Sequence, residues 1–268
     1  MAHVLVTGSA GYVGSHVVAL LKRAGHHPVV FDNLTRGFAE LVQPHAVPFV
    51  RGNLTDRALL RPVLHDYQID AILHFAALAY VGESTEVPDR YYRINTADGL
   101  TLLEEAIAYR PETPPALVFS STCAVYGTPT QLPIRETTAR CRISPYGRCK
   151  LSMEWMVADL SLQHHFGAVI LRYFNAAGAD PPIPSAIQAA EAGCPFFIHG
   201  DDFDTPDGTA ICDLVHVRDL AAAPIDALDD LIAGGETTDL NFGTGVGHSE
   251  RQVVHCIERI RRGAVGVR

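Results

Sequence analysis

Three regularly spaced glycines near the start of the chain constrain its fold more than any other feature. Gly8, Gly11 and Gly14 follow an apolar run at 3–7, apolar residues at helical spacing come after them, and a second apolar run stands at 29–32. Glycines at a strand-to-helix turn let the backbone approach a pyrophosphate, and the amino end of the helix supplies N–H groups and a positive dipole. The segment is therefore predicted to be the strand–helix–strand unit of a dinucleotide-binding domain.

An acidic residue, Asp32, closes the second predicted strand. It stands 18 residues after Gly14, about where a carboxylate would hold the ribose hydroxyls of adenosine. Its charge would repel a 2′-phosphate, which favours NAD over NADP, although Arg36 could accommodate that phosphate. The alternative is that the glycines only pack a helix on a strand and that Asp32 caps a strand end. The ordered succession of strand, glycines, helix, strand and acid favours the cofactor interpretation.

Strand and helix signals alternate through most of the chain, which predicts an α/β fold with a doubly wound, Rossmann-like parallel sheet. Further strands are expected at 46–50, 70–75, 116–120 and 167–172, and helices near 55–65, 87–109, 145–164, 217–233 and 248–262. A break rich in proline and glycine at 178–184 then interrupts the pattern. We therefore expect residues 1–177 to form the NAD-binding domain. Residues 178–268 would form a small, shortened substrate lobe, some of whose elements return to the first domain.

A phenol and an amine stand four residues apart at Tyr146 and Lys150. Ser144 and Pro145 precede them and are a helix-start signal, a side-chain cap followed by proline at the first helical position. On one helix face, a cation beside a phenol favours the phenolate, which suits a general base that takes a proton from an alcohol. Such a pair often lies on a helix surface without any catalytic role, but the dinucleotide turn upstream favours the catalytic interpretation.

Composition excludes several other classes of protein. The net charge is −9, whereas a protein that binds a nucleic-acid backbone is normally basic. No run of 18 apolar residues occurs, so we expect no membrane span. The chain enters a strand at once, which leaves no room for a signal peptide. The six cysteines form no Cys-x-x-Cys pair and indicate reduced thiols in the cytoplasm, and the thirteen histidines show no metal-ligand spacing, so we expect no metal.

Several longer motifs together resemble one family, the extended short-chain dehydrogenases/reductases and, within them, the UDP-glucose 4-epimerases. The matching segments lie at 6–16, 31–36, 74–77, 81–84, 120–127, 144–151, 171–179, 207–209 and 216–221. Thr-Cys-Ala-Val-Tyr-Gly at 122–127 is particularly similar to the epimerases. The related 4,6-dehydratases carry Asp-Glu after the threonine, where this chain has Cys123 and Ala124.

The resemblance implies a role for each matching residue. In catalysis, Tyr146 would take the proton of the sugar 4-hydroxyl, Lys150 would stabilise the phenolate and bind the nicotinamide ribose, and Thr122 would bind the hydroxyl. Substrate contacts would come from Thr122, Tyr146 and Asn175. The implied NAD-binding residues are Gly8, Gly11, Tyr12, Val13, Gly14, Asp32, Asn33, Leu34, Thr35, Arg36, Gly37, Asn53, Leu54, Phe75, Ala76, Ala77, Leu78, Ala79, Asn95, Tyr146, Lys150 and Phe174.

Five positions or segments depart from the family pattern. Asn53 stands where an aspartate is usual, and its amide oxygen could still accept from the adenine amine. Ala79 lies near a usual lysine, so that one phosphate contact would be lost. The segment between Asn175 and Asp207 is short and lacks an asparagine that helps to bind the nucleotide. Cys212 replaces a diphosphate-binding arginine, and cysteine cannot form the paired bonds of a guanidinium. The chain also stops before an arginine and a tyrosine that close over the substrate, as a truncated chain would.

The function expected from the resemblance is NAD-dependent 4-epimerisation of UDP-glucose and UDP-galactose through a transient 4-keto sugar, with weakened substrate binding. Alternatives are an epimerase of another nucleotide sugar, such as a UDP-pentose, and an NAD-binding pseudoenzyme or truncated product without turnover. Family members often pair through a helix bundle, and the helices at 87–109 and 145–164 would suit a homodimer. Helices that cover a sheet, however, carry the same apolar faces.

Overall fold

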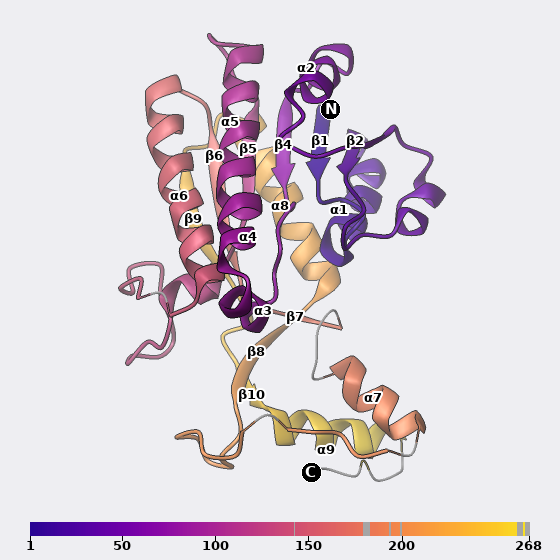
Figure 1. Ribbon diagram of the computed structural model, residues 1–268, viewed down its shortest axis with the longest axis vertical. Coiled ribbons are helices and arrows are strands. Elements are labelled where there is room, and N and C mark those ends of the chain that lie inside the picture. Colours follow the sequence, from indigo (N-terminus) through magenta and orange to yellow (C-terminus); the bar gives the residue numbers. More distant parts are fainter. Residues whose placement is uncertain (142, 179–182, 193, 199, 262–264, 266–268) are drawn as a thin grey trace. The chain divides into compact units, whose positions relative to one another are not determined.

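The alternating pattern folds into a single large sheet. The computed structural model describes residues 1–141, 143–178, 183–192, 194–198, 200–261 and 265. Within this part of the chain, seven strands form a sheet in the order β3-β2-β1-β4-β5-β6-β9 (Figure 1). They are β1 (His3–Thr7), β2 (His27–Asp32), β3 (Phe49–Arg51), β4 (Ala71–His74), β5 (Ala116–Thr122), β6 (Ala168–Tyr173) and β9 (Thr238–Phe242). The pairs from β3 to β6 are parallel, which confirms the predicted doubly wound α/β fold.

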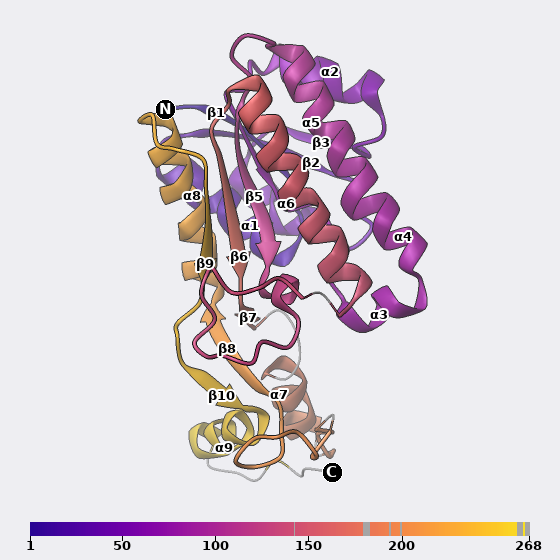
Figure 2. The same ribbon diagram turned by 90° about the vertical axis from the view of Figure 1, so that its left-hand side faces the viewer.

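Helices cover both faces of this sheet. They are α1 (Tyr12–Arg23), α2 (Arg57–Asp66), α3 (Val81–Glu86), α4 (Pro88–Tyr92), α5 (Asp98–Tyr109), α6 (Pro145–His164) and α8 (Val217–Ile232). In Figure 2 the sheet is seen nearly edge-on, with α5 and α6 on one side and α8 on the other. Short 3₁₀ turns lie at Ala39–Leu41, Gln43–His45 and Cys123–Tyr126. No described helix has the length and apolar character needed to cross a bilayer.

The central strands are apolar on both faces because helices bury both faces. Leu5 of β1, Ile72 of β4 and Leu117 of β5 lie in one core cluster with Leu102 of α5 and Val157 of α6. Each such side chain contributes roughly 1.5–3 kcal/mol by leaving water. The core of the sheet therefore fixes where each strand ends, and with it the position of the residues that follow.

The predicted start of α6 is confirmed. The Ser144 side chain accepts a hydrogen bond from the backbone N–H of Gly147 at 3.1 Å, and Pro145 occupies the first turn. The helix runs to His164, and His165 then adopts a left-handed conformation with φ of 56°. A cap and a terminal proline thus set the phase of the helix that carries Tyr146 and Lys150.

Two predicted elements differ from those observed. The strand expected at 46–50 begins only at Phe49, because Pro48 has no N–H to give to the sheet. The helix expected at 87–109 is interrupted by a π-helical turn at Arg93–Ala97, between α4 and α5. Such turns accommodate one extra residue and are frequent at functional sites.

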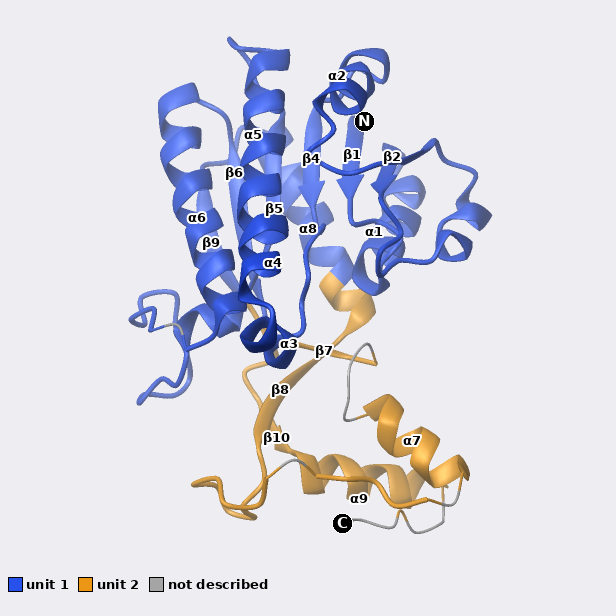
Figure 3. Cartoon of the chain, in the orientation of Figure 1, with its two compact units in different colours: residues 1–173, 221–241 blue, residues 174–220, 242–268 orange. Residues whose placement is uncertain are grey.

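The chain divides into two compact units (Figure 3). The first comprises Met1–Tyr173 and Ala221–Asn241, and the second Phe174–Leu220 and Phe242–Arg268. The sequence places its domain boundary after residue 177, a few residues beyond Tyr173.

The second unit contains α7 (Ile183–Ala192) and α9 (Glu250–Arg261) and a three-stranded sheet. Its strands are β7 (Asn175–Ala177), β8 (Ile211–His216) and β10 (Gly247–Ser249), in the order β10-β8-β7. A small core of Ala186, Phe196, Val253, Val254 and Ile257 holds its helices together. The predicted helix at 248–262 corresponds to α9, whereas α7 and the short strands were not predicted.

A buried histidine makes the stability of the first unit dependent on pH. His74 at the end of β4 lies with its Nδ1 2.7 Å from Thr7 Oγ1, and it stacks on Phe119. Burial, assisted by the charge of Lys150, lowers the pKa of His74 to about 3. Its pKa in the unfolded chain is about 6.5, so the unfolded state binds the extra proton between these values. This stability is complete above pH 6.5 and falls as the pH decreases, by about 1.4 kcal/mol per pH unit.

We therefore expect His74→Asn to reduce acid sensitivity. Between pH 7.5 and pH 5, the parent should lose about 2 kcal/mol more unfolding free energy than the variant, as measured by urea denaturation. The exposed His255 provides a control, since His255→Asn should keep the pH profile of the parent. Equal losses in parent and His74→Asn would show that this imidazole does not titrate on unfolding.

Candidate active site

The turn between β1 and α1 is shaped so that only glycine fits. Gly8 has a φ of 70°, and a Cβ there would lie 2.4 Å from the backbone nitrogen of Ala76. A Cβ at Gly14 would lie 2.5 Å from the carbonyl oxygen of Gly8. The N-cap of α1 is Gly11, which offers no side chain to the first N–H groups of the helix. An open helix start beside a close-packed glycine turn fits a bound pyrophosphate.

Asp32, at the end of β2, holds both the turn between β1 and α1 and the loop that follows β2. Its Oδ2 accepts from the N–H of Ala10 at 2.9 Å, and its Oδ1 accepts from the N–H of Leu34 at 2.8 Å. A carboxylate oxygen has more than one lone pair, so ribose hydroxyls could still donate to it. The carboxylate is thus buried and held in one orientation at the carboxyl edge of the sheet.

The loop after Asp32 is held by amide side chains. Asn33 donates from Nδ2 to Asn53 Oδ1 at 2.8 Å and accepts from the N–H of Thr35. The Asn53 oxygen, expected to accept from adenine, therefore already accepts one bond within the protein. Leu34 has a positive φ of 62°, and Gly37 packs so closely on Ala10 that a Cβ would clash.

Asn95 clamps the loop that follows β4. In the π-helical turn, its Oδ1 accepts from the N–H of Leu78 and its Nδ2 donates to the Leu78 carbonyl, both at 2.8 Å. The loop containing Phe75, Ala76, Ala77 and Ala79 is therefore held at the same sheet edge as Gly8. Leu54, predicted to flank adenine, is buried within the main core cluster.

Lys150 and Tyr146 lie on α6 beside the end of β5. Lys150 is only 3% exposed, and its Nζ donates to the Ser120 carbonyl at 2.7 Å and lies 4.8 Å from the Phe119 ring centre. Burial lowers the pKa of Lys150 to about 8. Tyr146 is buried and meets Tyr91 edge-to-face, with ring centres 6.4 Å apart. The expected pair thus occupies one buried helix face at the sheet edge.

Thr122, the last residue of β5, offers a hydroxyl near this helix. Its Oγ1 accepts from the N–H of Ala124 at 3.2 Å. A hydroxyl that accepts in this way retains its own proton for donation. Among the described residues, the first unit therefore brings Thr122, Tyr146 and Lys150 to the same sheet edge as the glycine turn and Asp32.

A buried charge network behind this group was not predicted. Arg172 of β6 is fully buried, and it donates to both carboxylate oxygens of Glu154 at 2.9 Å and to the Tyr126 hydroxyl at 2.8 Å. Ser121 donates to Glu154 Oε1 at 2.5 Å. The sequence did contain a signal, since an arginine within the apolar strand 168–173 requires a buried acidic partner.

The other predicted residues belong to the second unit. Phe174 donates its N–H to the Phe242 carbonyl at 3.1 Å, and Asn175 Nδ2 lies 3.4 Å from the Asp213 carbonyl oxygen. Cys212 lies in β8 opposite His248 of β10 and is partly buried. Burial raises the pKa of its thiol, so this position carries a neutral group.

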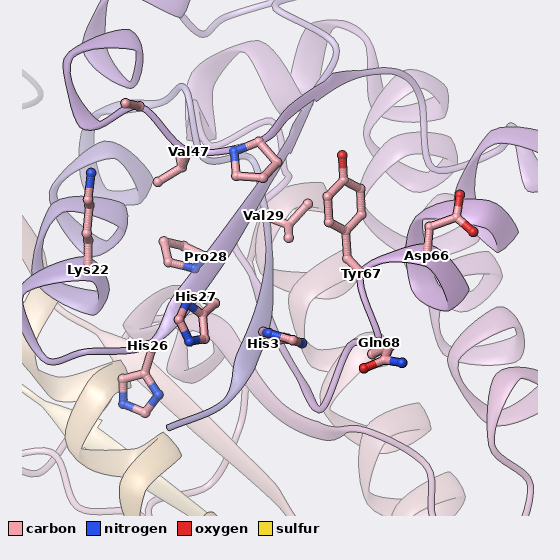
Figure 4. A pocket seen from close by; sticks show the side chains of 12 residues that line it. His3, Lys22, His26, His27, Pro28, Val29, Val47, Asp66, Tyr67 and Gln68 are labelled. Atoms are coloured by element: carbon pink, nitrogen blue, oxygen red, sulfur yellow. The ribbon is translucent and has the colours of Figure 1, made fainter.

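A cavity of about 370 Å³ lies elsewhere in the first unit (Figure 4). His3, at the start of β1, and His27, at the start of β2, line it together with Lys22, Tyr67 and Gln68. Because Gly8 and Asp32 follow the opposite ends of these strands, the cavity is not part of the candidate active site.

Comparison with known proteins identifies the family of this chain. The model of the NAD dependent epimerase/dehydratase family matches residues 4–243. The chain belongs to this family. A UDP-glucose 4-epimerase of Azospirillum brasilense is 44% identical over 271 residues, which cover 96% of this chain and 77% of that protein. The relative of Rhizobium meliloti with the same name is 42% identical, over 97% of this chain and 82% of that protein.

Solved structures of this epimerase/dehydratase family have the same fold. UDP-glucose 4-epimerase from Brucella ovis in complex with NAD superposes with a TM-score of 0.92 at 42% identity, over 100% of this chain and 85% of that one. The enzyme from Bifidobacterium longum in complex with NAD⁺ and UDP gives a TM-score of 0.90 at 31% identity, over 99% and 85%. The resemblance seen in the sequence motifs is confirmed.

The glycine turn provides a test of the cofactor site. In Gly14→Ala the new methyl group would meet the Gly8 carbonyl, so the turn must open and its N–H groups must move. We expect the affinity for NAD to fall at least about tenfold, because even 1.4 kcal/mol of lost contact has that effect. Calorimetric titration with NAD would measure this change.

Gly82 is the matched control, because a Cβ there meets nothing within 4 Å. Gly82→Ala should bind NAD as the parent does. Unchanged affinity in Gly14→Ala would mean that the dinucleotide does not use this turn.

Proposed function

We propose that this chain catalyses the NAD-dependent interconversion of UDP-glucose and UDP-galactose by inverting the hexose at C4 through a transient 4-keto sugar. The observation that carries this proposal is the group formed by Thr122, Tyr146 and Lys150 at the sheet edge that also carries the glycine turn. Its occurrence in a chain 44% identical to a UDP-glucose 4-epimerase supports the same reaction. The intact group favours an enzyme over an NAD-binding pseudoenzyme.

The first unit supplies the residues that would hold NAD. The amino end of α1 would receive the pyrophosphate, Asp32 would receive the adenosine ribose, and the loop clamped by Asn95 would line the cofactor. Tyr12 and Val13 complete the contacts proposed for this unit. The resemblance also assigns Phe174, which belongs to the second unit, to the cofactor. Bound NAD supplies a hydride acceptor that becomes a donor later in the same cycle.

Three side chains would handle the substrate proton. The buried ammonium of Lys150 favours the phenolate of Tyr146 one helical turn away, because opposite charges at low dielectric attract strongly. The phenolate would take the proton of the 4-hydroxyl and later return it to the 4-keto oxygen. Thr122 would donate to that oxygen and keep it within reach of Tyr146.

Two further features of the proposed enzyme are its cellular compartment and its oligomeric state. No disulfide bond joins its six cysteines, which supports a reducing compartment, and we propose the cytoplasm. On α6, the side chains of Trp155 and Leu162 are 48% and 78% exposed. These two residues stand seven positions apart and so lie on one face of α6, and we also propose a homodimer through this helix and the helices of 87–109, which a mass measurement in solution would test.

We expect Tyr146→Phe to lower the kcat for UDP-galactose by about 10²–10⁴-fold, because the variant has no group to accept the 4-hydroxyl proton. Binding of NAD should survive, since the ring still packs on Tyr91. The half-exposed Tyr92 gives a control, and Tyr92→Phe should turn over normally. Product analysis after incubation with UDP-galactose would measure both. Near-normal turnover in Tyr146→Phe would assign the proton to another group.

A second prediction concerns the affinity for the diphosphate group of UDP. Family members resembling this chain carry an arginine where Cys212 stands, and each charge-assisted bond contributes about 1.5–3 kcal/mol. We expect Cys212→Arg to strengthen UDP binding by about one to two decades, as measured by calorimetry. Cys256→Arg adds the same charge at an exposed position of α9 and should leave UDP affinity unchanged. Tight binding of UDP by the parent would show that other groups hold the diphosphate.

A further inference from the structure

Arg36, the residue that could accept the extra phosphate of NADP, has its guanidinium in contact with other side chains of the protein. Arg36 lies in the loop that follows Asp32, and its side chain is 49% exposed. Its Nη2 donates to Glu83 Oε1 of α3 at 2.6 Å, and its guanidinium lies 5.5 Å from the centre of the Tyr80 ring. The guanidinium is therefore engaged by an anion and an aromatic ring.

Glu83 is itself held in place for this contact. Its side chain is 24% exposed, and its Oε2 accepts from the hydroxyl of the buried Tyr91 at 2.9 Å. Burial, followed by the carboxylate of Glu83, raises the pKa of Tyr91, so the phenol remains a neutral donor. Tyr91 OH also lies 2.7 Å from the Tyr80 carbonyl oxygen, and Arg90 Nη1 lies 4.0 Å from Glu83 Oε1. Arg36 therefore makes a much shorter contact with Glu83 than Arg90 does.

The pair contributes little to stability, because solvent screens an ion pair at this exposure. Its effect on a ligand is larger. A guanidinium makes strong paired hydrogen bonds to a phosphate, and Arg36 stands in the loop beside the predicted ribose site. While Glu83 neutralises Arg36, the carboxylate of Asp32 repels a 2′-phosphate without compensation.

We propose that Glu83 is a cofactor-specificity residue, which engages Arg36 and so withholds it from the 2′-phosphate of NADP. This inference rests on the proposed NAD-dependent function and adds a second source of selectivity to Asp32. Removing the charge of Glu83 takes away the ionic attraction that holds Arg36, whereas an amide oxygen at the same position still accepts from the Tyr91 hydroxyl and preserves the local fold.

The test is calorimetric titration of nucleotide-free protein with NAD⁺ and NADP⁺. In Glu83→Gln, the affinity for NADP⁺ should rise about tenfold while the affinity for NAD⁺ stays within threefold. The double variant Glu83→Gln/Arg36→Met should lose this gain, because the released guanidinium is absent. Glu86→Gln removes an equal charge from an exposed position of the same helix and should change neither affinity.

A separate variant tests the idea without altering Glu83. Arg36→Met alone should leave NADP⁺ affinity within twofold of the parent, because the guanidinium is already engaged. An unchanged NADP⁺ to NAD⁺ ratio in Glu83→Gln, or a large loss of NADP⁺ affinity in Arg36→Met, would overturn the inference and leave the proposed function intact. A parent that binds neither nucleotide would overturn the proposed function itself.

Discussion

A fully buried ion pair between Arg172 and Glu154 is the interaction on which the candidate active site depends. Arg172 belongs to β6 and Glu154 to α6, and Asp239 of β9 lies 2.6 Å from Arg172 Nη2. Taking such charges out of water is costly, and a well-packed apolar replacement is often as stable. Loss of one partner alone typically costs about 3–5 kcal/mol, because the other charge stays buried. The pair therefore contributes mainly to specificity, because only the arrangement in which β6 and α6 are in contact avoids an unpaired buried charge.

The requirement to keep this ion pair fixes the position of α6, the helix that carries Tyr146 and Lys150, against the sheet. Glu154 is one turn beyond Lys150, and it accepts from Ser121 at the end of β5. Ser120, the preceding residue, supplies the carbonyl that Lys150 Nζ contacts, and Thr122 follows directly. A rotation or a shift of α6 would thus break buried bonds before it moved Tyr146 away from Thr122. Rigid elements hold the chemistry here, whereas the cofactor loops depend on single clamps such as Asp32 and Asn95.

The parts of the fold that follow local rules could be predicted from the sequence. The Ser144–Pro145 cap gave the start of α6, and apolar runs gave the strands that carry the sheet edge. The π-helical turn at Arg93–Ala97 could not be predicted, because no residue preference marks it, and its Asn95 contacts Leu78, which lies 17 positions away. The engagement of Arg36 by Glu83 is similarly non-local, since these residues lie 47 positions apart.

The residues proposed to bind the cofactor and those proposed to bind the substrate diphosphate differ in how they tolerate substitution. The cofactor residues depend mostly on backbone geometry, as at Gly8 and Gly14, where the constraint is the absence of a side chain. Recognition of the UDP-sugar diphosphate is proposed to depend instead on a charged side chain at position 212, where Cys212 supplies a neutral thiol in a partly buried strand. A single codon change can therefore weaken substrate binding without disturbing the sheet or the turn. Because Tyr146 and Lys150 belong to the first unit and Cys212 to the second, the proposed proton-transfer group can persist where residue 212 has changed.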